Sequence, residues 1–80
     1  MFRIVVCFSH KCHTCFDHIK KLQSLFDLEL IDMDENQDLY EIMNIDKTPT
    51  TILYKKQNEL WRKEGMFFDS QINDMRKMMK

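Results

Sequence analysis

The sequence predicts one α/β domain over residues 1–80, built on a four-stranded mixed sheet with helices on both faces. Three observations predict it: a β-branched run at 3–8, a helical apolar stripe leading into a second strand, and a hairpin pattern after a proline. A strand–helix–strand crossover usually joins parallel strands, whereas two strands joined by a tight turn lie antiparallel. The expected order is therefore βαβ, a short helix, then ββα, with the first strand central.

The first half of the chain contains two strands and two helices. Arg3–Phe8 is a continuous apolar run, typical of a strand buried on both faces. From Cys12 onward the spacing becomes helical, and the pattern over Phe16–Phe26 gives one apolar stripe. Leu28–Met33 reads as the second strand. The stripe contains Cys15, Ile19, Leu22 and Phe26, with Phe16 and Leu25 beside it.

The remaining elements follow from turn and cap signals. Asp38–Met43 predicts a short helix that stops at a left-handed Asn44, with Leu39, Ile42 and Met43 facing inward. Thr51–Tyr54 and Glu59–Glu64 predict a hairpin, which Gly65 ends. A last helix capped by Asp69 or Ser70 is expected to bury Ile72, Met75 and Met79.

Composition narrows the possible functions. The chain has 12 basic and 13 acidic residues and a net charge of −1, so nothing favours a nucleic-acid or anionic-membrane partner. No apolar run is long enough for a transmembrane span, and no signal peptide is evident. Three cysteines is an odd number, which argues against a secreted disulfide scaffold. We therefore expect a cytoplasmic monomer.

Cys12 and Cys15 are the strongest functional signal. They lie where the first strand gives way to the first helix, and we expect both on the first helical turn. Thiols three residues apart there can close a disulfide, and the helix N-terminus stabilises the thiolate of the first one. We therefore expect a depressed pKa for Cys12. Such a Cys-x-x-Cys pair is primarily a redox signal and secondarily a metal signal.

A metal-binding module is the alternative hypothesis. Three histidines, His10, His13 and His18, lie close enough in sequence to complete a zinc site with the two cysteines. On a helix beginning near Cys12, His13 would point away from the cysteines, whereas His18 would be at a workable spacing. Copper carriage is a second form of this hypothesis, because soft metals also bind paired thiolates.

Four features resemble the thioredoxin/glutaredoxin superfamily, and they are spread over nearly the whole chain. They are the strand-Cys12-x-x-Cys15-helix junction, the acidic strand end at 32–34, Thr48-Pro49-Thr50 before a hairpin, and Gly65 before the last helix. The resemblance implies a minimal thioredoxin-like fold and a dithiol–disulfide oxidoreductase that uses no cofactor beyond its own Cys12–Cys15 disulfide.

The resemblance also implies roles for single residues. Cys12 would be the attacking thiol and Cys15 the resolving thiol, with Lys11, His13 and Thr14 as their environment. Pro49 would be a cis-proline facing the disulfide, and the backbone of Thr48 would bind an extended substrate. Gly65 would be the third substrate-binding position. The implied partners are a disulfide-containing protein and a reductase or glutathione as electron donor.

Some positions depart from the thioredoxin pattern. Lys11 replaces the tryptophan before the first cysteine, and Val6 stands where thioredoxins carry a buried proton-transfer aspartate. We therefore expect His13 or solvent to carry that proton. Of the remaining candidates, Cys7 is expected to be a buried core thiol. His18 is expected on the solvated side of the first helix.

Overall fold

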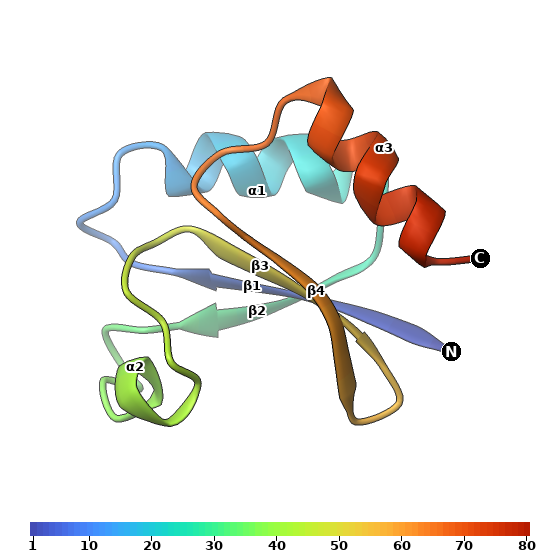
Figure 1. The fold of residues 1–80 in the computed structure, drawn as a ribbon. Coiled ribbons are helices and arrows are strands. Elements are labelled where there is room, and N and C mark those ends of the chain that lie inside the picture. Colours follow the sequence, from blue (N-terminus) through green and yellow to red (C-terminus); the bar gives the residue numbers. More distant parts are fainter.

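The computed structural model describes residues 1–80, and it has the predicted order of elements (Figure 1). Every predicted helix and strand is present, although most boundaries differ by one to three residues. The elements are β1 (Phe2–Phe8), α1 (Cys15–Gln23), β2 (Leu28–Asp32), α2 (Leu39–Ile42), β3 (Thr50–Lys55), β4 (Asn58–Glu64) and α3 (Asp69–Met78).

The four strands form one mixed sheet in the order β2-β1-β3-β4. β1 runs parallel to β2, with Ile4 opposite Leu28, and antiparallel to β3, with Val6 opposite Thr51. β3 and β4 form the predicted antiparallel hairpin. The first strand is therefore an interior strand, as its continuous apolar run predicted.

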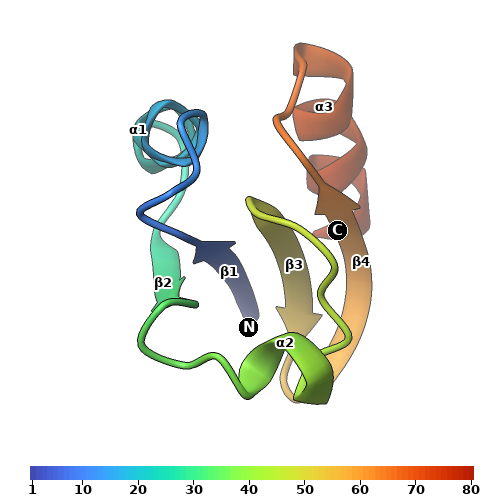
Figure 2. The same ribbon diagram turned by 90° about the vertical axis from the view of Figure 1, so that its left-hand side faces the viewer.

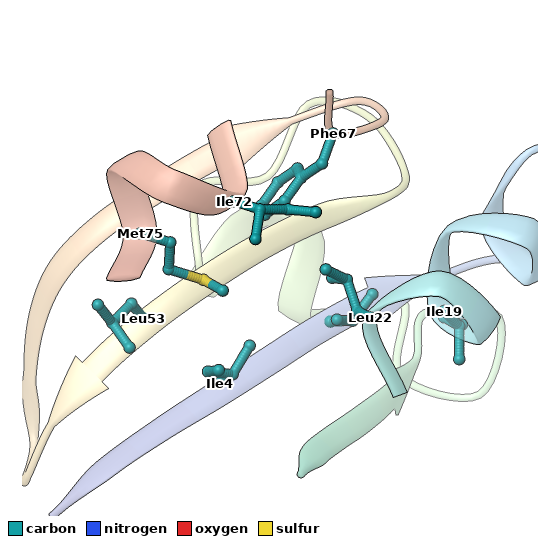
Figure 3. Close-up of a cluster of buried hydrophobic side chains, with 8 residues drawn as sticks. Ile4, Ile19, Leu22, Leu53, Phe67, Ile72 and Met75 are labelled. Atoms are coloured by element: carbon teal, nitrogen blue, oxygen red, sulfur yellow. The ribbon is translucent and has the colours of Figure 1, made fainter. Parts of the chain in front are cut away.

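Helices cover both faces of the sheet (Figure 2). α1 and α3 lie on one face, where eight buried side chains form the larger core (Figure 3): Ile4, Val6, Ile19, Leu22, Leu53, Phe67, Ile72 and Met75. α2 lies at the opposite face, over a smaller core of Val5, Cys7, Met33, Ile45 and Ile52. Successive β1 residues supply the two cores alternately, because side chains alternate across a strand.

α1 is shorter at both ends than the helix expected from near Cys12 to Phe26. It begins at Cys15 and ends at Gln23, so the last predicted turn, through Phe26, is not helical. Phe16 and Leu25 are about half exposed, because they lie beside the stripe that faces the sheet. The hydrophobic period identified the helix and its buried face, but a period carries no information about where a helix starts.

The prediction for the inward side of α2 is wrong at one residue. Ile42 is 71% exposed, whereas Ile45, three residues further on, is 4% exposed and packs in the smaller core. α2 has only one turn, and the chain leaves it through Asn44 at φ 58°, as predicted. That left-handed residue redirects the chain, so the helical period no longer applies and Ile45 enters the core.

The residue at the N-cap of α3 was also predicted incorrectly. Phe68 occupies the cap position and Asp69 is the first helical residue. The exposed backbone N–H of Phe68 donates to the Gln71 side chain at 2.7 Å, which supplies the capping bond. Ile72 and Met75 are buried as expected. None of the three helices has the length and apolar character that crossing a bilayer would require.

Candidate active site

Cys12 and Cys15 form a disulfide at the C-terminal end of β1, with their Cα atoms 5.4 Å apart. Cys15 is the first residue of α1 and is fully buried, whereas Cys12 is partly exposed in the turn that precedes the helix. Of the two sulfurs, that of Cys12 is therefore the more accessible. The place of the disulfide agrees with open α/β sheets in general, whose sites lie at the carboxyl ends of the strands.

Cys12 does not lie on the first helical turn, which corrects the expectation from sequence. Its backbone N–H donates to Ser9 O at 3.1 Å and its carbonyl accepts from Cys15 N at 3.3 Å, so it belongs to two successive turns. Thr14 occupies the N-cap position without a side-chain cap bond. The sulfur of Cys12 still lies beside the helix N-terminus, because it is bonded to that of the first helical residue.

Two oxygen atoms flank the sulfur of Cys12. Thr14 Oγ1 lies 3.6 Å away and Thr48 O lies 3.4 Å away. The Thr14 hydroxyl can donate to a thiolate, and hydrogen bonds to the charged form of a group lower its pKa. The Thr48 carbonyl can accept from a thiol. The two contacts therefore suit different protonation states of Cys12.

Pro49 joins this site to the end of the hairpin. The Thr48–Pro49 peptide bond is cis, and the Pro49 side chain is fully buried. The Pro49 carbonyl accepts from the N–H of Gly65 at 2.7 Å. Gly65, at φ 83°, adopts a backbone conformation that glycine reaches without strain. Gly65 therefore lies next to Pro49 at the start of β3.

A groove of about 410 Å³ opens beside Cys12. Three predicted site residues line it: Lys11, Cys12 and Thr48. The exposed His13 does not, and neither do Thr14, Cys15, Pro49 and Gly65. Tyr40 and Lys47 also line it and were not predicted as site residues. Lys47 could have been found from its position next to Thr48-Pro49, but Tyr40 carried no signal. The complete lining is Ser9, Lys11, Cys12, Tyr40, Asp46, Lys47 and Thr48.

Asp34 holds the loop that leads to Cys12. One of its carboxylate oxygens accepts from Ser9 Oγ and the other from the backbone N–H of His10, both at 2.8 Å. The backbone bond from His10 and then the Ser9 bond lower the pKa of Asp34. The acidic strand end thus ties the turn after β1 to the turn after β2.

His18 is buried, contrary to the expectation of a solvated side chain. It lies on the inner face of α1, where its Nε2 is 2.9 Å from Thr51 Oγ1 and its ring meets that of Phe67 edge-on at 4.9 Å. Burial, followed by the charge of Lys21, lowers its pKa. The prediction from sequence was wrong because histidine was counted as a polar residue when the apolar face of the helix was assigned. Its position next to Ile19 and three residues after Cys15 was a signal that it lies on that face.

Cys7 lies in the smaller core as expected and forms no disulfide. Burial raises the pKa of its thiol to about 11, against an opposing effect from Arg62.

The metal-binding hypothesis needs a third ligand beside Cys12 and Cys15, and the structure places none there. His10, Asp32 and Asp34 are the residues whose ligand atoms lie within 4.8 Å of one another, and neither cysteine is among them. His10 instead contacts Asp32 at 2.9 Å.

A mixed four-stranded sheet, helices on both faces and a disulfide at the end of β1 define a thioredoxin-like fold. No family model and no curated protein sequence matches the chain. Solved structures of thioredoxins do match it.

Thioredoxin from Fasciola hepatica superposes with a TM-score of 0.84 at 19% identity, covering 99% of this chain and 81% of the other. Thioredoxin 1 from Thermosipho africanus gives 0.83 at 25% identity, covering 96% and 93%. The germline thioredoxin Deadhead from Drosophila melanogaster gives 0.83 at 19% identity, covering 95% and 79%. The resemblance to the thioredoxin-like superfamily is thereby confirmed for the fold.

Proposed function

We propose that the protein is a thiol–disulfide oxidoreductase whose working group is the Cys12–Cys15 couple. The observation that carries this proposal is the unequal burial of two bonded sulfurs at the C-terminal end of β1. Thiol–disulfide exchange needs one accessible thiolate to attack and a second thiol held within reach to resolve the mixed disulfide. Cys12 and Cys15 meet these two requirements in that order.

The reaction begins when the Cys12 thiolate attacks one sulfur of a substrate disulfide. A Cys12–substrate bond forms, and the other substrate sulfur leaves as a thiolate. Cys15 then attacks the Cys12 sulfur, closing the Cys12–Cys15 disulfide and releasing the second substrate thiolate. Two electrons pass from the dithiol to the substrate, and a reductase or glutathione must return them before the next cycle.

The substrate proposed for the groove beside Cys12 is an extended segment of a disulfide-containing protein. The Thr48 backbone supplies an edge next to the sulfur, and the cis Pro49 that follows it sets the direction of that edge. Lys11 and Lys47, against Asp46, give the groove a net positive charge. The unpaired Cys7 thiol suits a reducing compartment such as the cytoplasm, which we propose as the location.

Insulin reduction by dithiothreitol tests the activity. The wild-type protein should accelerate the appearance of turbidity over dithiothreitol alone. Cys12→Ser should abolish the acceleration, because it removes the attacking sulfur. Cys15→Ser should also lose turnover, and it should accumulate a Cys12–substrate mixed disulfide that mass spectrometry detects.

Cys7→Ser is the matched control, since it removes a thiol outside the couple. It should retain wild-type turnover whenever circular dichroism shows it to be folded. Turnover by Cys12→Ser at the wild-type rate would overturn the assigned roles. Absence of turnover together with one zinc per chain in the purified protein would favour the metal-binding alternative.

A further inference from the structure

The imidazole of His18 is a buried group with one unused nitrogen. Its exposed fraction is 0%, its Nε2 contacts Thr51 Oγ1 at 2.9 Å, and its Nδ1 has no hydrogen-bond partner. Leaving a buried polar atom unpaired is destabilising, so such atoms call for an explanation. No other buried side chain of the protein carries an imidazole or a carboxylate.

The neighbour of His18 on α1 is the resolving cysteine. Cys15 precedes it by three residues, and both side chains are fully buried on the inner face of the helix. Residues at this spacing have β-carbons about 5–6 Å apart. The Cys15 sulfur of the disulfide has no proton to donate, whereas the reduced thiol has one.

The surroundings of His18 favour a neutral ring. Phe67 contacts its ring edge-on, and one cation lies on its own helix and another on the neighbouring hairpin. Lys21 lies on α1, and Lys63 lies opposite Thr51 on β4. Asp69 is 3.5 Å from the Lys21 ammonium and partly balances it. When Nε2–H donates to Thr51, Nδ1 of the neutral ring carries a free lone pair and can act as a base.

We propose that His18 is the proton acceptor for Cys15 in the resolving step of the proposed thiol–disulfide exchange. Cys15 must become a thiolate to attack, yet burial in apolar surroundings raises the pKa of a thiol. The β1 neighbour opposite Thr51 is Val6, which cannot accept a proton. The step therefore requires a base between α1 and the sheet, and His18 is the buried residue there that can accept a proton. This inference rests on the proposed function.

The chemistry balances without any further reagent. The Cys15 proton moves to Nδ1 of His18 directly or through one water molecule. The resulting thiolate bonds to the Cys12 sulfur, and the Cys12–substrate bond breaks with its electron pair on the leaving sulfur. The dithiol is oxidised, the substrate disulfide is reduced, and the imidazolium returns its proton to the leaving thiolate or to solvent.

Rapid mixing of the reduced protein with excess 5,5′-dithiobis(2-nitrobenzoate) separates the two steps. Attack by Cys12 releases the first nitrothiobenzoate at a rate proportional to the reagent concentration. Attack by Cys15 releases the second in an intramolecular phase that is independent of it. His18→Gln is the test variant, because its amide can still bond to Thr51 but cannot take up a proton reversibly.

At pH 7 the second phase of His18→Gln should be roughly 100-fold slower than in wild type, the scale of general-base catalysis. The first phase should stay within about twofold. The deficit should shrink at pH 9, where hydroxide can remove the thiol proton. A second phase within about twofold of wild type at pH 7, or one slowed equally at both pH values, would overturn the proposal.

Two further measurements keep the test decisive. Thr51→Val retains the imidazole but removes its bond, so its second phase should lie between those of wild type and His18→Gln. If His18→Gln does not fold, the wild-type profile decides: the second phase should be nearly independent of pH around neutrality and should slow only in acid, where His18 becomes protonated, since burial lowers its pKa. A second phase that already slows about tenfold per pH unit between pH 8 and pH 7 would contradict the role. A wild-type protein that lacks the first phase would instead contradict the proposed function.

Discussion

At the scale of single residues, the three thiols differ because their positions on the fold differ. Cys12 stands in a turn with two oxygen atoms beside its sulfur, whereas Cys15 begins a helix and points into the core. Cys7 lies on the opposite face of the sheet from the helix that carries Cys15. Residue type is the same in each case, so exposure and neighbours determine the chemistry.

Cys7 should resist alkylation in the folded protein. With its pKa raised to about 11, only about a thousandth of the thiol is ionised at pH 8, and the side chain is buried. With the Cys12–Cys15 disulfide intact, we expect iodoacetamide to modify Cys7 at least about 100-fold more slowly in buffer than in guanidinium chloride. Mass spectrometry measures both rates. Native and denatured rates within tenfold of each other would show that Cys7 is accessible.

At the scale of elements, the junctions between helices and strands position the site. The turn from β1 to α1 holds Cys12, the chain after α2 turns left-handed at Asn44, and the β4 end returns to Pro49 through Gly65. The last two junctions each need a backbone conformation with positive φ, which Asn44 and Gly65 adopt. The sequence has a single glycine, and it lies at one of these junctions.

Gly65→Ala should destabilise the fold by about 1–2 kcal/mol, because an L-residue is strained at φ 83°. No atom lies within 4 Å of an added β-carbon, so the loss comes from the backbone alone. Gly65→Asn should lose less, since asparagine tolerates the left-handed region. Urea unfolding of both variants gives the comparison, and equal losses for alanine and asparagine would refute the backbone explanation.

At the scale of the whole molecule, the sheet is stabilised by two cores of unequal size. α1 and α3 bury the larger one, while α2 and the chain that follows it cover the smaller one. A chain of 80 residues has a net stability of roughly 4–12 kcal/mol. Loss of one well-packed side chain from either core is therefore a large fraction of the total.

The pair Ile45 and Ile42 tests the smaller core with one residue type. Ile45→Ala should cost about 2–5 kcal/mol, because it leaves a cavity beside Met33 and Ile52. Ile42→Ala should change stability by less than about 0.5 kcal/mol, since its side chain is 71% exposed. Both values come from denaturant unfolding, with the same dependence of the unfolding free energy on denaturant concentration for both variants. Similar losses for the two variants would place Ile42 in the core after all.

Much of the fold could be predicted because periodicity and turn residues report directly on local structure. The buried strand at the centre, the hairpin after Pro49 and the left-handed Asn44 each follow from a local pattern. The start of α1 and the inward side of α2 did not follow, since a period does not specify where a helix begins or where the chain turns. The Cys12–Cys15 pair was evident from its spacing, whereas Tyr40 reaches the groove only through tertiary packing.

The sequence by itself determined the order of elements, the disulfide pair and its place between strand and helix, because these depend on residues close together in the chain. Only the tertiary structure decided how the groups around the pair are arranged. It brings Thr48 to the Cys12 sulfur across 36 residues and buries His18 against Thr51 across 33. The physical reason is that burial and long-range hydrogen bonds are properties of the packed sheet and helices, and no local pattern encodes which polar side chain they will enclose.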